Sequence, residues 1–150
     1  LDETRRALNS LRASPLEEMG LALAVRTLAE DTASRCGMIL EMDILDHLDD
    51  LSMEVEQCYY RVAQEALANL SEHSAAETVK LTLKSSSKGL LMKIEDDGVG
   101  MDSSIISGQN GSKFGLRGMR ERAELIGAHF DVDSQPGSGT KVELFLEDAG

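Results

Sequence analysis

Aromatic side chains and positive charges are both scarce in this chain. It has no tryptophan and an aromatic share of 3%, so a surface that stacks on nucleic-acid bases or sugars is not expected. Only 15 lysine and arginine residues stand against 27 aspartate and glutamate residues, which gives a formal net charge of −12. Because an acidic surface repels phosphate backbones, we expect no nucleic-acid partner. An anionic ligand would need a metal ion, backbone amides or a few well-placed cations.

Cysteine occurs only twice, and long apolar runs are lacking. Cys36 and Cys58 have neither metal-ligand nor redox spacing, and 150 residues can bury a core without a disulfide. We therefore expect two buried thiols in a reducing compartment. No signal peptide is visible, and no apolar run approaches the ~20 residues that a membrane span needs. These absences predict a cytoplasmic location and leave open whether the parent protein is anchored in a membrane.

Hydrophobic periodicity predicts one domain that mixes helices and strands. Helices are expected at 2–13, 16–34, 52–74 and 115–127, and strands at 38–45, 79–84, 90–97, 129–134 and 140–147. This order indicates an α+β fold, a two-layer α/β sandwich whose mixed, mainly antiparallel sheet has helices on one face. The stretch 97–114, rich in glycine and serine, is predicted to be a long loop of the kind that is usually functional or disordered.

The helix predicted at 52–74 has a polar stripe beside its apolar face. Ser52 is a suitable N-cap for it. Glu65, Asn69 and His73 recur at every fourth position, at the edge of the core-facing side. Carboxylate and carboxamide oxygens there suit a Mg²⁺ ion whose shell is completed by phosphates. An amphipathic helix with polar flanks would give the same pattern.

A carboxylate is predicted to turn inward where strand 90–97 ends. The apolar residues of the strand alternate toward the core, and Asp96 continues that alternation. A buried carboxylate needs a donor, and the amino group of a ligand would provide one. At Gly98 and Gly100 the missing Cβ lets the backbone approach a flat ring, and the hydroxyl of Thr140 could join the hydrogen bonds of Asp96. The alternative is an Asp-Gly turn between strands.

The start of the helix predicted at 115–127 is a candidate phosphate site. Gly115 and Gly118 stand in its first turn, where free N–H groups and the positive end of the helix dipole attract anions. Lys113 and Arg117 are the nearest cations. A helix start after a flexible loop is the structural alternative. Each of these patterns is weak alone, but four of them in a fixed order are specific.

Together the segments resemble the ATP-binding domain shared by histidine kinases, DNA gyrase B, MutL and the Hsp90 chaperone. QEALANLSEH (64–73) is similar to the N box of that family. DDGVG (96–100) and FGLRGM (114–119) are similar to its first and second glycine boxes, and GSGTKVEL (137–144) is similar to its closing glycine-threonine segment. The nitrate-sensor-like subfamily of sensor histidine kinases is similar at LRASPLEEMGL (11–21), QEALANL and GLRGMRERAELIGA (115–128). A Walker A sequence is absent, so no P-loop is expected.

The resemblance implies a role for each matching position. Asn69 would ligate Mg²⁺, and Glu65 would act near the metal as a proton acceptor or water-orienting group. Asp96, supported by Thr140, would accept a hydrogen bond from the adenine amino group of ATP. The remaining nucleotide-binding positions would be His73, Gly98, Gly100, Lys113, Gly115, Leu116, Arg117 and Gly118, beneath a lid at about 101–114.

The function implied is that of a protein-histidine kinase module in a two-component system. It would transfer the γ-phosphoryl group of Mg-ATP to a histidine. His47, His73 and His129 do not lie in a helix like the family's dimerisation helix, so the acceptor is expected outside this chain. Residues 1–14 would then be the end of the dimerisation and phosphoacceptor region, and 15–150 the catalytic domain, unable to autophosphorylate alone. Expected partners are that region in a homodimeric parent and a response regulator with helix-turn-helix output.

Glu72 departs from the family's pattern, because related N boxes have Lys or Arg just before the histidine of the box. On a regular helical wheel Glu72 falls near Glu65, which would replace a phosphate-binding cation by a carboxylate. Three alternatives therefore stay open. They are a non-kinase ATPase of the same fold, such as a chaperone or mismatch-repair type, a degenerate nucleotide-binding or interaction domain, and an anti-sigma serine kinase.

Overall fold

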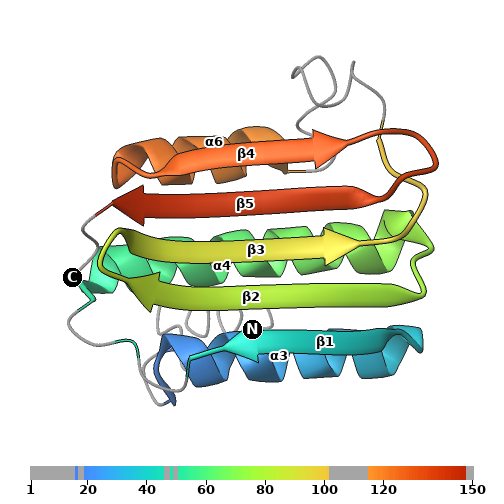
Figure 1. Ribbon diagram of the computed structural model, residues 1–150, viewed down its shortest axis with the longest axis horizontal. Helices are drawn as coiled ribbons and strands as arrows, with labels where there is room; N and C mark the ends of the chain where they lie inside the picture. Colours follow the sequence, from blue (N-terminus) through green and yellow to red (C-terminus); the bar gives the residue numbers. More distant parts are fainter. Residues whose placement is uncertain (1–15, 17–18, 46–47, 49–50, 102–114, 148–150) are drawn as a thin grey trace, which may run out of the picture.

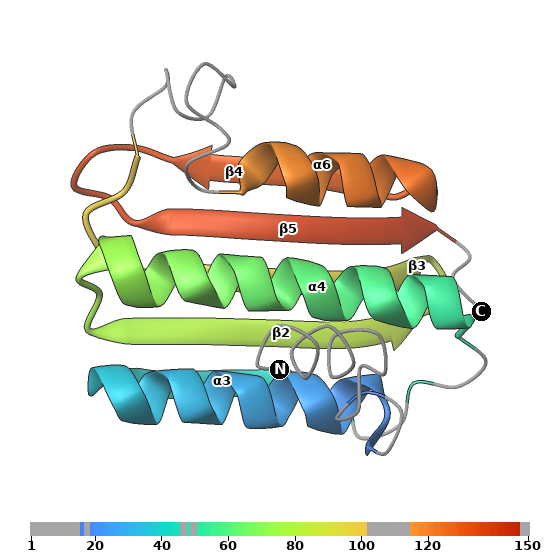
Figure 2. The same cartoon turned by 180° about the vertical axis from the view of Figure 1, so that it is seen from behind.

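The computed structural model describes residues 16, 19–45, 48, 51–101 and 115–147, which form a two-layer fold (Figure 1). Its elements are α3 (Leu21–Cys36), β1 (Ile39–Ile44), α4 (Met53–Asn69), the π-helical turn η1 (Leu70–Ser74), β2 (Thr78–Ser86), β3 (Gly89–Asp96), α6 (Leu116–Leu125), β4 (His129–Ser134) and β5 (Thr140–Glu147). The three α-helices lie on one face of the sheet (Figure 2). The predicted α+β class is confirmed.

The sheet has five strands in the order β1-β2-β3-β5-β4. Only β1 and β2 are parallel, and α4 is the crossover between them. The other neighbours are antiparallel, and their register places Asp96 of β3 directly opposite Thr140 of β5. Asp96 and Thr140, which the sequence predicted to turn inward, therefore meet at the same end of the sheet, where β3 ends and β5 begins.

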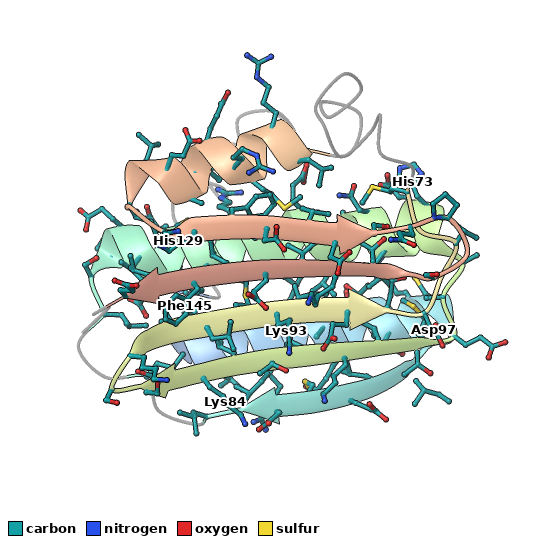
Figure 3. All side chains as sticks on the ribbon, turned by 45° about the horizontal axis from the view of Figure 1, so that its top comes forward. His73, Lys84, Lys93, Asp97, His129 and Phe145 are labelled. Carbon is teal, nitrogen blue, oxygen red and sulfur yellow. The ribbon has the colours of Figure 1, made fainter. Side chains whose placement is uncertain are left out.

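The two faces of the sheet differ in chemistry. Toward the helices the strands present apolar side chains, such as Leu81, Met92 and Leu144, which are at most 1% exposed. Across the open face the register aligns a row of opposite charges on neighbouring strands, namely Lys80, Glu95, Lys141 and Asp133. Figure 3 labels Lys84 and Lys93 on the same face. Cross-strand charge pairs of this kind stabilise one register, since a slip by one residue would bury them.

Helix α4 is the centre of the core. It begins as predicted at Ser52, whose hydroxyl oxygen accepts a hydrogen bond from the backbone N–H of Val55 at 3.2 Å. Tyr59 is fully buried, and its hydroxyl donates to the carbonyl of Leu90 in β3 at 2.7 Å. This hydrogen bond joins the two layers in the middle of the core, where an unpaired carbonyl would be costly.

Two predicted helices have different bounds in the structure. The helix expected from residue 16 is interrupted at Gly20, whose φ of 79° is left-handed, and α3 starts after it. The helix expected over 52–74 is α-helical only to Asn69, and the π turn η1 follows. Ala75 then takes a left-handed φ of 50°, which turns the chain toward β2. A π turn accommodates an extra residue and is common at functional sites.

The two cysteines lie in different environments, so the prediction of two buried thiols is wrong for one of them. Cys36, at the end of α3, is exposed because the helix extends beyond the edge of the core. Cys58 is buried in α4, and burial raises the pKa of its thiol to about 11. The Cys58 thiol therefore stays protonated at neutral pH and behaves as a small core side chain.

Among the helices of the described residues, none has both the length and the apolar character needed to cross a membrane. The helix predicted at 2–13 and residues 102–114 of the predicted long loop lie outside the described residues.

The change Tyr59→Phe tests the link between the layers. It removes the donor to the Leu90 carbonyl and leaves that buried oxygen without this partner. We expect the free energy of unfolding, measured by urea denaturation, to fall by about 1–3 kcal/mol. Tyr60→Phe, the same change at the next position, is the control and should cost less. Equal losses of unfolding free energy in the two variants would show that the hydrogen bond of Tyr59 does not contribute to stability.

Candidate functional site

A cavity of about 270 Å³ lies between α4 and the ends of β3 and β5. Its lining combines six predicted site residues from the four segments that resemble the family's boxes, namely Asn69, His73, Asp96, Gly100, Leu116 and Thr140. The rest of the lining is mostly apolar and includes Ile94, Val99, Met101 and Val142. His73 and Asp97 mark this end of the sheet in Figure 3, whereas His129 lies at the opposite end. The cavity is suited to a flat apolar group with a few polar atoms.

Asp96 is the half-buried carboxylate of this cavity. Its Oδ1 accepts a hydrogen bond from the backbone N–H of Gly98 at 2.8 Å. Burial raises the pKa of Asp96 above its ordinary value of 3.8, while the backbone amides of Gly98 and Thr140 partly oppose the rise. The protein thus keeps a charged acceptor in a place where charge is unfavourable. A ligand N–H group would satisfy it.

The neighbouring carboxylate, Asp97, has a different task. Its Oδ1 accepts hydrogen bonds from the backbone N–H groups of Glu77 at 2.9 Å and Thr78 at 3.0 Å. The hydrogen bond from Thr78 is the main reason why the pKa of Asp97 is lowered. Asp97 therefore links the end of β3 to the start of β2 and stabilises the end of the sheet at which the cavity opens.

The wall beside Asp96 consists of two glycine segments packed against each other. A Cβ on Gly100 would collide with the carbonyl of Gln135, and one on Gly139 would collide with the carbonyl of Asp96. Both glycines have left-handed φ angles, 73° and 79°. The backbone N–H of Gly137 also donates to the carbonyl of Val99 at 2.7 Å. Gly100 lines the cavity, while Gly98 is buried behind Asp96.

Ser134 links the two glycine segments of this wall through hydrogen bonds, and it was not among the predicted site residues. Its hydroxyl oxygen accepts from the backbone N–H of Met101 at 2.8 Å and donates to the carbonyl of Gly139 at 2.9 Å. The Thr140 hydroxyl lies 2.8 Å from it. Because the single hydroxyl proton of Ser134 goes to Gly139, Thr140 is the donor in that pair. Thr140 therefore supports Asp96 through its backbone amide, with its hydroxyl turned to Ser134.

The polar stripe of α4 is divided between two cavities. Asn69 and His73 line the first one, whereas Glu65 lines a second cavity of about 220 Å³ between α4 and α6. Glu65 also lies against Gly115, where a Cβ would strike its carboxylate. Gly115 has a left-handed φ of 67° and is the N-cap of α6.

The π turn changes the place of Glu72. The expectation that Glu72 falls near Glu65 assumed a regular α-helix, but in η1 the Glu72 Oε2 lies 3.4 Å from the Nε2 of His73. Its side chain is 67% exposed, and it lines neither cavity.

Of the two predicted cations, only Arg117 is among the described residues, and it lines neither cavity. The Nε of Arg117 lies 3.3 Å from the Oε1 of Glu121, with the Arg117 side chain 79% exposed, and Lys113 lies outside the described residues. Arg61 and Arg122 line the second cavity instead. Arg61 could have been found from the sequence, since it lies four residues before Glu65 and extends the same stripe by one turn.

The residues that line the first cavity fit a nucleotide, but they offer few protein atoms as ligands for a metal ion. Within the described part of the chain, no three His, Cys, Asp or Glu side chains converge on one metal position. The carboxamide oxygen of Asn69, at the edge of the first cavity, is a suitable ligand for Mg²⁺ if ligand oxygens complete its shell.

The first cavity lies between the segments of the chain that resemble the family's boxes, with one inward carboxylate among mostly apolar side chains. The chain belongs to the histidine kinase-, DNA gyrase B-, and HSP90-like ATPase family, whose sequence model matches residues 54–150. The resemblance in the sequence is thereby confirmed.

Individual relatives agree with this assignment. The oxygen sensor histidine kinase NreB of Staphylococcus carnosus is 31% identical over 144 residues, which are 96% of this chain and 41% of that protein. The sensor histidine kinase LiaS of Bacillus subtilis is 33% identical over 153 residues, with 99% and 41% covered. The chain thus spans less than half the length of these relatives.

A solved structure shows the same fold. The blue-light activated histidine kinase of Erythrobacter litoralis EL346 superimposes with a TM-score of 0.73 at 21% sequence identity. The match covers 99% of this chain and 49% of that one.

The change Asp96→Asn tests whether the site carries an electrostatic cost. A raised pKa in the folded state means that the charged carboxylate disfavours folding, so this cost develops as the pH rises from 3.8 through the folded pKa. We expect Asp96→Asn to raise the melting temperature at pH 7, and the gain to vanish near pH 3.

Asp97→Asn is the matched control for that experiment. The pKa of Asp97 is lowered, so its charge stabilises the fold above 3.8 and this stabilisation is lost as the pH falls. The control should therefore lower the melting temperature at pH 7. Shifts of the same sign for both variants would contradict the assigned environments.

Ser134→Ala tests the connection of the glycine wall. The variant removes the acceptor of the Met101 N–H and the donor to Gly139. We expect a loss of about 1–3 kcal/mol in unfolding free energy and faster hydrogen exchange at the Met101 amide. Ser138→Ala, in the exposed turn, should change neither quantity. Unchanged exchange at Met101 in Ser134→Ala would refute the connection.

Proposed function

We propose that this chain is the ATP-binding catalytic module of a sensor histidine kinase. The single observation that carries the proposal is the carboxylate of Asp96, turned into an apolar cavity that faces Asn69 of α4. The family and the sensor kinases among its relatives support the kinase class over a non-kinase ATPase of the same fold.

Adenine recognition follows from the chemistry of the cavity. The carboxylate of Asp96 accepts a hydrogen bond from an amino group, and the apolar side chains around it, such as Ile94 and Val142, contact a flat ring. A base with a carbonyl in place of the amino group would set two acceptors against each other, which costs affinity. The site should therefore prefer adenine to guanine nucleotides.

The phosphate end lies along α4. Bound Mg-ATP supplies a transferable phosphoryl group and a metal ion that neutralises its charge. Asn69 holds the metal with its carboxamide oxygen, and Glu65, one turn of about 5.4 Å earlier, accepts a proton or orients water. The backbone amides at Gly115, Leu116 and Gly118 bind phosphate oxygens.

The acceptor and the further partners lie outside the described residues. The acceptor histidine belongs to a dimerisation and phosphoacceptor region of a homodimeric parent, of which residues 1–14 are the end. A response regulator with helix-turn-helix output receives the phosphoryl group in the cytoplasm. The names of the relatives, which are sensor kinases, support this two-component role.

Calorimetric titration with ATP and GTP, with and without magnesium, tests nucleotide binding. We expect ATP to bind at least about tenfold more tightly than GTP in the wild type, because one hydrogen bond to a charged acceptor is at stake. Asp96→Asn should abolish this preference. If wild-type protein bound GTP as well as ATP, the role of Asp96 would be wrong.

Asn69→Ala tests metal binding at the same site. The variant removes the carboxamide oxygen, so magnesium should no longer strengthen ATP binding, while adenosine should bind as before. The comparison of ATP affinity with and without magnesium measures this effect. A full magnesium effect in Asn69→Ala would remove this residue from the metal site.

Kinase activity is tested by mixing this chain with the acceptor region of its parent protein and radiolabelled ATP. Acid-labile label on the acceptor histidine is expected. Steady-state hydrolysis of ATP by the chain alone, without transfer, would favour the non-kinase ATPase.

A further inference from the structure

The second cavity, between α4 and α6, contains an unusual glycine. Gly118 lies within the α-helix, its φ angle is not positive, and a Cβ built on it meets no atom within 4 Å. Neither backbone conformation nor packing requires glycine there. In a helix interior glycine costs about 1 kcal/mol relative to alanine, and α6 is only 10 residues long. The missing side chain of Gly118 instead leaves more space in the cavity on the side of α6.

Two arginine residues line the same cavity from different helices. Arg61 comes from α4, where its Nη1 donates to the Oε1 of Gln64 at 3.3 Å, and Arg122 comes from α6. Among the described residues of the lining, Glu65 is the one carboxylate. Two positive charges and one negative charge leave the cavity with a positive balance, in a chain whose net charge is −12. Guanidinium groups bind phosphate oxygens through two parallel hydrogen bonds.

The arginines of α6 have separate roles, which makes the position of Arg122 informative. Arg117 pairs with Glu121 on the outer side of the helix, and the guanidinium of Arg120 lies over the ring of Phe130 at 5.2 Å. Arg122 is the α6 arginine that lines the cavity. Arg122 therefore does not belong to the contacts that Arg117 and Arg120 make on the outer surface of α6.

The cavity lies beside the proposed nucleotide site along α4. Asn69 lines the first cavity, and Glu65 and Arg61 follow toward the start of the helix, each one turn of about 5.4 Å further on. A ligand whose base contacts Asp96 and whose charged end follows α4 past Asn69 reaches this second cavity. Glu72, where related chains have a cation, is 67% exposed beside His73 and lines neither cavity.

We propose that Arg61 and Arg122 bind the terminal phosphate of the nucleotide, with Gly118 leaving room for it. This inference rests on the proposed function, because it takes the ligand to be ATP. The pair supplies from α4 and α6 the positive charge that the chain lacks at residue 72. An acidic side chain of the acceptor region is the competing occupant, and the experiment separates the two.

Titrations of the whole chain with ATP, ADP and adenosine test this site. In Arg61→Gln and Arg122→Gln, ATP affinity should fall about tenfold or more, since each variant loses a charge-assisted contact. ADP and adenosine should stay within about twofold of the wild type. Arg120→Gln, which removes the same charge from α6 outside the cavity, is the matched control and should keep the ATP-to-ADP ratio.

Gly118→Ala gives a second, independent measurement. The added methyl group enters the space on the α6 side of the cavity without a clash in the protein, so the variant should melt at a higher temperature than the wild type. It should nevertheless lose the preference for ATP over ADP. A variant that is more stable and yet binds ATP worse cannot be explained by misfolding.

Three results would overturn the inference. An unchanged ATP-to-ADP ratio in both arginine variants would remove the terminal phosphate from this cavity. Unchanged ATP affinity with slower phosphorylation of the acceptor region would assign the cavity to the acceptor instead. If the wild type bound neither ADP nor adenosine, the proposed function itself would fail, and this site with it.

Discussion

The burial of the Asp96 carboxylate depends on the pairing of β3 with β5, and most of the site depends on that burial. Asp96 stands opposite Thr140, and the Cα of Gly139 packs on the carbonyl of Asp96. This close approach fixes the direction of the Asp96 side chain, since the backbone has no room to shift. The carboxylate is then held among apolar groups, where burial raises its pKa. A protein that served stability alone would place a neutral side chain here.

Adjacent residues of the same type can therefore have opposite functions. Asp96 and Asp97 differ by one position in the chain, which at the end of a strand means opposite faces of the sheet. Asp97 is satisfied by two backbone N–H groups and stabilises the edge. Asp96, supported by the backbone amides of Gly98 and Thr140, lines the cavity. Environment, rather than residue type, separates the structural carboxylate from the functional one.

The sequence predicts what depends on local periodicity. The alternation of strand residues brought Asp96 and Thr140 to the same end of neighbouring strands, and the helical repeat of α4 placed Asn69 beside the core. The α-helical repeat ends at η1, and no residue pattern marks where a helix admits an extra residue, so the sequence did not predict the contact of Glu72 with His73. Arg122 could not be found either, since its relation to Arg61 depends on how α6 packs on α4.

The open face of the sheet has a consequence for how this domain meets other molecules. Its row of Lys80, Glu95, Lys141 and Asp133 matches positive and negative charges within the plane of the sheet. A partner that settled on this face would have to dehydrate every one of these charges and reproduce their alternation, which few surfaces can do. Association through the open face of the sheet therefore carries a high desolvation cost, which the apolar lining of the first cavity does not have.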